Sequence, residues 1–232
     1  MYGFYYYDYN YFLYMLLTMG ISMYAHFKVQ STFNKYSKIR CERGITGAEA
    51  AETVLSGNNV SDIHIGKIRG RLSDHFDPRD NTISLSDAVY SNTSISAVGV
   101  AAHEAGHAVQ HTKGYTPIKI RQALVPIAQF GSGISIPLVF IGLLLPIQYS
   151  FMVNLGIFLF SMAVLFELVT LPVEFDASRR AVKSLENLGI LNNEELYGVK
   201  KVLKAAAFTY VAAAFTSILS LLRLLLIARR KN

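Results

Sequence analysis

The sequence has few charged residues and a single cysteine. Of its 232 residues, 16% are charged and 52% are hydrophobic. This composition excludes an ordinary soluble domain and a disordered chain, because both contain more charge and fewer apolar residues. Cys41, the only cysteine, cannot form an intramolecular disulfide, so the cysteine content does not require an oxidising compartment. The sequence also lacks internal repeats, which argues against a transporter built from inverted repeats.

Positive charge exceeds negative charge in this apolar chain. There are 22 Lys and Arg residues against 16 Asp and Glu residues, which gives a net charge of +6. A basic balance is compatible with nucleic-acid binding, but in an apolar chain basic residues more often mark the cytoplasmic side of a bilayer. We therefore expect a protein of the cell membrane whose partner is the lipid bilayer, and no binding of nucleic acid.

Apolar stretches of about 20 residues, the length with which a helix crosses the hydrocarbon core, occur four times. They cover residues 7–27, 124–146, 151–171 and 205–228. No Lys or Arg precedes the first stretch, which distinguishes it from a secretory signal peptide and predicts a retained helix. Only residues 147–150 separate the second and third stretches, so these two are expected to form a tight helical hairpin.

The distribution of basic residues predicts the orientation of these helices. Lys and Arg are frequent in the segment 28–121 and absent from the N-terminus and the hairpin turn. The positive-inside rule therefore predicts that 28–121 is cytoplasmic, and the hairpin returns the chain to the same side at Pro172. A full crossing of the last helix would place the basic C-terminal end outside, and Arg223 within this helix needs a partner. The sequence leaves open whether the last helix crosses completely.

The segment 28–121 contains two helix signals. Thr46 and Glu49 form a capping-box pattern for a helix over 47–56. A second helix is expected over 94–111, with Ser94 or Ser96 as its cap.

Strand signals lie between these two helices. Alternating apolar residues predict strands at 60–65, 68–72 and 82–85, which we expect to form a small antiparallel sheet. The first two strands would form a hairpin through Gly66 and Lys67. The whole chain is thus expected to be a mainly α, multi-pass membrane protein. It would comprise one domain, residues 1–232, with about four transmembrane helices and a small α+β cytoplasmic portion.

The second of the two helices contains the sequence His103-Glu104-Ala105-Gly106-His107. Histidines four residues apart lie on one helical face, so both imidazoles can bind one Zn²⁺ at about 2.1 Å. Glu104 would then lie beside the open coordination position. The pattern predicts that His103 and His107 are ligands of one zinc ion per chain and that Glu104 is the catalytic general base.

A zinc hydrolase of this kind needs a third protein ligand. His111 is about 12 Å from His103 along a continuous helix, too far for one coordination sphere. Metzincins break this helix with a glycine three residues after the second histidine, so that a third histidine can bind the metal. This chain has Gln110 at that position, which excludes the metzincin arrangement. Glu174 is the strongest candidate, because the predicted hairpin returns the chain beside the two histidines.

Glu167 is a second acidic residue near the third apolar stretch. It lies two helical turns before Glu174 and would face the same side. Because it falls inside a predicted span, we expect it to pair with a Lys or Arg, conceivably Arg223, rather than to bind zinc.

These motifs resemble those of the YugP-type membrane zinc metallopeptidases, which are distantly similar to HtpX and the CAAX prenyl proteases. The resemblance rests on the residues 103–110, 74–80 and 174–178 and on the order of the spans. It implies a multi-pass, zincin-like protease whose zinc is held by His103, His107 and Glu174. In HtpX-like proteases an Asp four residues after the glutamate supports the site. Ser178 occupies that position here, so the support would come from elsewhere, such as Asp176.

Further residues are candidates for substrate binding. His75, Arg179 or Arg180 could stabilise the oxyanion of a tetrahedral intermediate, and the sequence does not choose among them. The stretch from Asn81 to Leu85, with Ile83 at its centre, resembles an edge strand that pairs with an extended substrate. An ordinary sheet strand is equally consistent with this stretch.

The expected activity is hydrolysis of peptide bonds near the cytoplasmic membrane face, with peptides or membrane proteins as substrates. A catalytically inactive zinc-binding scaffold or assembly factor is the alternative.

Overall fold

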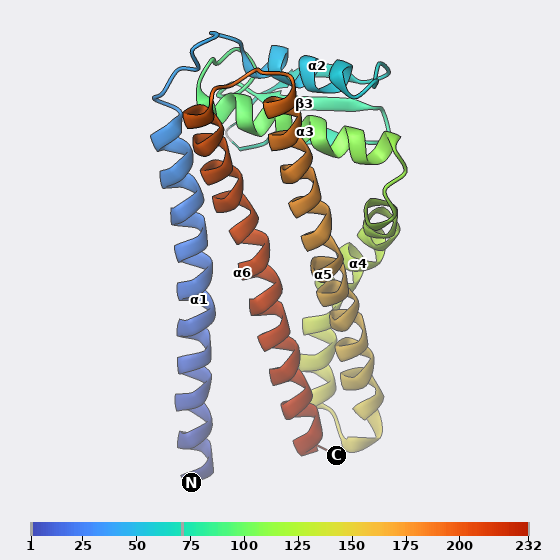
Figure 1. The fold of residues 1–232 in the computed structure, drawn as a ribbon. Helices are drawn as coiled ribbons and strands as arrows, with labels where there is room; N and C mark the ends of the chain where they lie inside the picture. Colours follow the sequence, from blue (N-terminus) through green and yellow to red (C-terminus); the bar gives the residue numbers. More distant parts are fainter. Residues whose placement is uncertain (1, 71, 232) are drawn as a thin grey trace. The chain divides into compact units, whose positions relative to one another are not determined.

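The computed structural model describes residues 2–70 and 72–231. This part of the chain is mainly α-helical, with a small sheet and one short 3₁₀ helix (Figure 1). In chain order the elements are α1 (Tyr2–Tyr36), α2 (Gly47–Gly57), β1 (His64–Ile68), β2 (His75–Asp77), β3 (Thr82–Ser86), α3 (Ile95–Thr112), α4 (Thr116–Leu144), η1 (Ile147–Tyr149), α5 (Ser150–Asn187) and α6 (Asn193–Lys231). The predicted fold class is confirmed.

The chain divides into two compact units. Each of the helices α1, α4, α5 and α6 has residues in both units. The helical unit comprises Met1–Lys28, Ala123–Leu168 and Phe208–Asn232. The α+β unit comprises Val29–Gln122 and Val169–Ala207. The α+β unit therefore contains the predicted motif helix together with the continuation of α5 that carries Glu174.

In the part of the chain that the structure describes, four helices are long and apolar enough to cross a membrane, which confirms the predicted number of spans. Their candidate segments are Tyr11–Tyr36, Thr116–Leu144, Ser150–Asn187 and Asn193–Arg229. Each helix is longer than its predicted apolar stretch, because polar residues continue it into the α+β unit. The 38 residues of α5 extend to about 57 Å, well beyond the roughly 30 Å hydrocarbon core.

The predicted hairpin of α4 and α5 is present in the helical unit. Leu145, Pro146 and the single 3₁₀ turn η1 join the two helices. A Cβ atom on Gly156 of α5 would lie 2.6 Å from the side chain of Val139 on α4. The absence of a side chain at this position therefore lets the two helices pack closely.

The expectation that Glu167 pairs with a Lys or Arg, conceivably Arg223, is wrong for the described residues, since none of the ion pairs among them includes Glu167. The Arg223 guanidinium lies over the rings of Tyr11 and Tyr14, 3.9 and 5.2 Å from their centroids. One carboxyl oxygen of Glu167 is buried with no hydrogen-bond partner among the described residues. Attraction to the aromatic faces, rather than to a carboxylate, accommodates this arginine.

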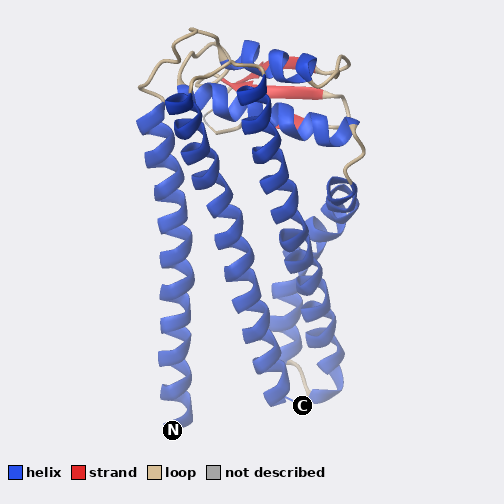
Figure 2. Ribbon diagram, viewed as in Figure 1, coloured by secondary structure: helices blue, strands red, loops and turns tan. Residues whose placement is uncertain are grey.

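The sheet of the α+β unit has the strand order β1-β3-β2 (Figure 2). β1 runs parallel to β3, whereas β2 runs antiparallel to it. The predicted all-antiparallel sheet is therefore wrong. β1 continues through Gly66 and Lys67, where a turn was predicted, and Gly70, which follows β1, has a φ of +121°.

β3 is the central strand of this sheet. Hydrogen bonding to β1 on one side and β2 on the other occupies its backbone, and the side chains of Ile83 and Leu85 have no exposed surface. Asn81, with a φ of +55°, belongs to the turn that precedes the strand. The prediction that residues 81–85 form an edge strand is wrong, and the edges are β1 and β2.

The two predicted helices of the α+β unit begin at the predicted caps. Thr46 and Glu49 form a complete capping box at the start of α2. The Ser94 hydroxyl accepts a hydrogen bond from the Ala97 amide at the start of α3. α2 packs against α3, and α3 also contacts β2 and β3. Nearly all of α3 is buried, which holds the motif histidines in a rigid setting.

Candidate metal centre

Two histidines of α3 and one glutamate of α5 form a candidate metal-binding group, called here the His-His-Glu group. It consists of His103, His107 and Glu174, and one possible ligand atom from each lies within 4.8 Å of the other two. Glu174 Oε2 is 3.2 Å from His103 Nε2 and 3.5 Å from His107 Nε2. Ligands of tetrahedral zinc with bonds of about 2.0–2.1 Å are separated by about 3.3 Å. The donor set and its spacing therefore fit a zinc ion.

A glycine inside the motif allows α3 and α5 to approach each other. A Cβ atom on Gly106 would lie 2.6 Å from the carbonyl oxygen of Ala177. No side chain fits at that distance without displacing a backbone. Gly106 lies between the two motif histidines and Ala177 lies one turn after Glu174, so this contact fixes the spacing within the group.

Arg121 from α4 also reaches Glu174. Its Nη1 atom lies 3.6 Å from Oε1, while Oε2 faces the histidines. This proximity confirms the expectation that the hairpin brings the start of α4 back beside the end of the third span. Sequence reasoning did not include Arg121 among the site residues. The sequence did indicate this proximity, because Arg121 lies 53 residues before Glu174, at the other end of the same hairpin.

Gln110 determines the orientation of His107. Its side-chain NH₂ donates to the carbonyl oxygen of Val173 at 2.8 Å and to Asp176 Oδ2 at 2.9 Å. These two acceptors orient the amide so that its oxygen faces His107 Nδ1, at 3.1 Å. His107 Nδ1 must then be the protonated nitrogen, which leaves the lone pair of Nε2 free for a metal. In the sequence, Gln110 served only to exclude the metzincin pattern, which has a glycine at this position. Its spacing of three residues from His107, which places both on one helical face, was the signal for its role.

Asp176 is buried and receives hydrogen bonds from both neighbouring arginines. Arg179 donates to Oδ1 and Arg180 donates to Oδ2, the oxygen that also accepts from Gln110. The structure thus places Asp176 behind His107, linked to it through Gln110. Arg179 and Arg180, predicted as possible oxyanion donors, both form ion pairs with this carboxylate.

Ser178 occupies the corresponding place behind His103. Its Oγ lies 3.2 Å from His103 Nδ1, so the Nδ1 atoms of both histidines have partners and both Nε2 atoms face Glu174. Bonds of this kind orient metal-binding imidazoles and select their tautomer. The serine that replaces the expected aspartate therefore still supports the ring, as a neutral partner.

Glu104 is almost completely buried, at 8% exposure. Burial raises the pKa of its carboxyl group to about 7; His103 and His75 lower the pKa and Glu174 and Asp74 raise it further. A carboxyl group with a pKa near 7 exchanges protons readily at neutral pH. Asp74 is held by the backbone amide and the hydroxyl of Ser86, at 2.7 and 3.1 Å.

His75 lies on the edge strand β2, and its ring is anchored to the backbone. The Nδ1 atom is 2.8 Å from the Ser73 carbonyl oxygen, an acceptor that requires a proton on Nδ1. The neutral ring then presents only an acceptor at Nε2. His75 can donate a hydrogen bond to an oxyanion only as the imidazolium.

His111 lies in the last turn of α3, outside the His-His-Glu group. Its nearest polar partner is the Gln122 amide at 3.4 Å, and its ring lies 5.8 Å from that of Phe76. The expectation that His111 is a helix-end residue rather than a ligand agrees with this position.

Comparison with known proteins adds an independent line of evidence. The model of a family described as "putative neutral zinc metallopeptidase" matches residues 11–229. The chain is 46% identical over 218 residues to the "Putative membrane protease YugP" of Bacillus subtilis (strain 168), an alignment that covers 93% of this chain and 96% of that protein. No solved structure matches this chain. With four candidate membrane spans and a His-His-Glu group beside Glu104, the chain belongs to this family of membrane zinc metallopeptidases.

Proposed function

We propose that this protein is a zinc-dependent endopeptidase of the gluzincin type that hydrolyses peptide bonds at the cytoplasmic face of the membrane. The observation that supports this most directly is the convergence of His103, His107 and Glu174. Two imidazoles and one carboxylate leave a fourth tetrahedral position open, which is the arrangement of catalytic rather than structural zinc sites.

The three residues of the His-His-Glu group would hold one zinc ion per chain. When bound, zinc supplies a Lewis acid that polarises the peptide carbonyl and makes water a nucleophile near neutral pH. Glu104 accepts the proton of the attacking water and delivers it to the leaving amine. Gln110 accepts from His107 Nδ1 and so leaves the Nε2 lone pair of that ring for a metal, and Ser178 orients the ring of His103 through its Nδ1 atom.

The substrate chain has one suitable edge near the motif helix. β2 is an edge strand that contacts α3, and its residues are partly exposed. An extended peptide can pair with its free backbone groups, which the central strand β3 cannot offer. We propose that β2, rather than residues 81–85, aligns the substrate.

Placement on the cytoplasmic side rests on the basic residues of the segment 28–121. Cysteine accessibility tests it: the exposed position Ser61 on the α+β unit is replaced by cysteine in a Cys41→Ala background and labelled in intact cells with a membrane-impermeant maleimide. Labelling only after the membrane is opened supports the cytoplasmic placement, and labelling of intact cells contradicts it.

A zinc-binding scaffold without turnover is the alternative function. Purified wild type, Glu104→Gln and His103→Ala are compared for zinc content and for cleavage of a broad peptide library. We expect wild type to cleave, Glu104→Gln to keep zinc but lose cleavage, and His103→Ala to lose both. Zinc-loaded wild type that cleaves no peptide would favour the scaffold.

A further inference from the structure

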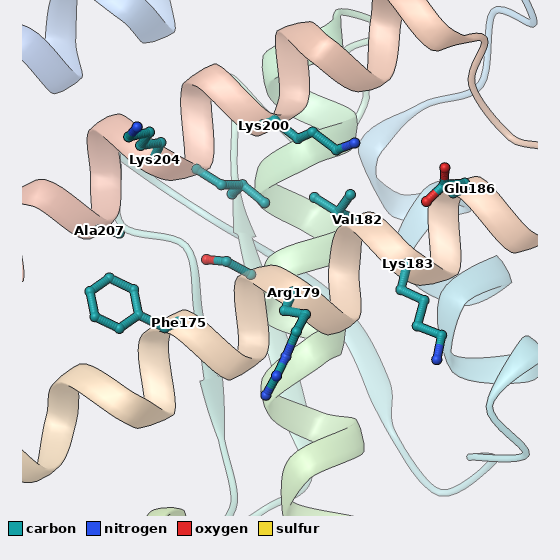
Figure 3. A pocket seen from close by; sticks show the side chains of 10 residues that line it. Phe175, Arg179, Val182, Lys183, Glu186, Lys200, Lys204 and Ala207 are labelled. Atoms are coloured by element: carbon teal, nitrogen blue, oxygen red, sulfur yellow. The ribbon is translucent and has the colours of Figure 1, made fainter.

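A groove with a volume of about 430 Å³ lies between residues 175–186 of α5 and residues 200–207 of α6 (Figure 3). All of its residues belong to the α+β unit. Its apolar lining consists of Phe175, Val182, Leu203 and Ala207. We call it the α5–α6 groove.

The α5–α6 groove changes character along its length. Phe175 and Ala207 lie at one end, whereas Glu186 and Lys200 lie toward the other (Figure 3). The apolar end is also where both helices continue into their spans, since the apolar stretch of α5 ends shortly before Phe175 and that of α6 includes Ala207. A ligand that fills the groove therefore needs an apolar part beside Phe175 and Ala207 and a polar part beside the charged side chains.

Basic side chains dominate the polar lining of the groove. Lys183, Lys200 and Lys204 form no ion pair with any residue that the structure describes. Arg179 is paired with Asp176, and Glu186 is the single acidic residue among those that line the groove. The surplus of ammonium groups favours a ligand with net negative charge.

We propose that the α5–α6 groove binds an anionic glycerophospholipid. Its anionic headgroup would lie at the lysines that line the groove, and one acyl chain would extend along Phe175 and Ala207. Basic pockets next to membrane-spanning helices attract anionic headgroups, and each ammonium group near the membrane surface contributes roughly fivefold to the association. A soluble acidic peptide satisfies the lysines but leaves the apolar end without a partner.

The groove also borders the supports of both motif histidines. Ser178, which lies next to His103 Nδ1, lines the groove, and so does Arg179, which donates to Asp176. A lipid in the groove therefore lies close to the residues that orient the His-His-Glu group. The proposal itself concerns binding, and it holds whether or not the protein cleaves peptides.

The absence of tryptophan from the chain permits a direct binding test. Phe175→Trp places one tryptophan in the full-length protein at the apolar end of the groove. The variant is reconstituted in phosphatidylcholine bilayers with small fractions of brominated lipid, which quenches tryptophan on contact. We expect brominated phosphatidylglycerol to quench about tenfold more effectively than brominated phosphatidylcholine. Phe158→Trp, on the 58% exposed side chain within the apolar stretch of α5, should show no such preference.

Charge-matched variants test the role of the lysines. Lys200→Gln/Lys204→Gln in the Phe175→Trp background should remove the preference, whereas Lys119→Gln/Lys201→Gln, which removes two exposed lysines outside the groove, should leave it intact.

The remaining outcomes overturn the proposal. Equal quenching by both lipids, or an equal loss in the two double variants, would show that the groove has no site for an anionic lipid. Relief of quenching by millimolar inorganic phosphate would indicate an anion site without lipid specificity. Relief by a soluble tetraglutamate peptide would identify a peptide site.

Discussion

The side-chain amide of Gln110 donates to Asp176 at 2.9 Å, across 66 residues of sequence. Through this bond a carboxylate on α5 fixes the tautomer of His107 on α3, because the amide that faces Asp176 must present its oxygen to the imidazole. The orientation of a motif histidine therefore depends on a helix outside the motif.

Replacing Gln110 by leucine removes both its acceptor and its donor from a fully buried position. We expect zinc affinity to fall about 10- to 100-fold, because partners of this kind orient metal ligands. Competition with a chromogenic chelator measures the affinity. Gln122→Leu is the matched control, since the Gln122 amide lies 3.4 Å from His111, outside the His-His-Glu group, and its loss should leave zinc binding unchanged. Equal affinity of wild type and Gln110→Leu would show that Gln110 has no orienting role.

Ser178→Ala removes a single neutral hydrogen bond from His103. Such a bond contributes about 1 kcal/mol, so we expect about fivefold weaker zinc binding, a smaller loss than in the Gln110 variant. Ser184→Ala on the same helix removes a hydroxyl that accepts only from Asn58 and serves as the control. A loss greater than that of Gln110→Leu would contradict this order of importance.

Gly106→Ala tests the close contact of α3 and α5. The added Cβ would lie 2.6 Å from the Ala177 carbonyl oxygen, and we expect overpacking to cost about 1–3 kcal/mol and to weaken zinc binding. Gly133→Ala on α4 is the control, because a Cβ there meets nothing within 4 Å and alanine favours a helix. Thermal unfolding in detergent compares the two. If both variants are as stable as wild type, the helices have room to separate at Gly106.

Arg121→Gln leaves the buried carboxylate of Glu174 without its nearby cation. We expect the metal-free protein to lose about 1–2 kcal/mol, since the arginine is partly exposed and the separation is 3.6 Å. Zinc should remove most of this loss, because the ion then balances the carboxylate. Unfolding with chelator and with zinc makes the comparison, with Lys119→Gln as the control. The same loss in both conditions would exclude charge compensation as the role of Arg121.

The features that local patterns determine were predicted correctly. The capping box at Thr46, the cap at Ser94 and the four apolar helices follow from short-range propensities and length. The meeting of His103 and Glu174 followed from the topology of a hairpin, which requires no knowledge of side-chain packing.

The strand pairing and the side-chain partners of Gln110 and Arg121 were not predicted. Gly66 and Lys67 are compatible with either a turn or a strand, and only the parallel pairing of β1 with β3 selects the strand. The roles of Gln110 and Arg121 were missed for the same reason, since each depends on a partner on another helix. Sequence spacing alone cannot assign such partners.

The separation of the ligands along the chain also has a consequence for biosynthesis. His103 and Glu174 are 71 residues apart, with α4 and most of the apolar part of α5 between them. Synthesis proceeds from the N-terminus, so a nascent chain exposes both histidines before the ribosome has made the glutamate. The His-His-Glu group can close only after the α4–α5 hairpin has been completed. A nascent chain that ends before Glu174 therefore has no complete metal centre, although both of its histidine ligands have been made.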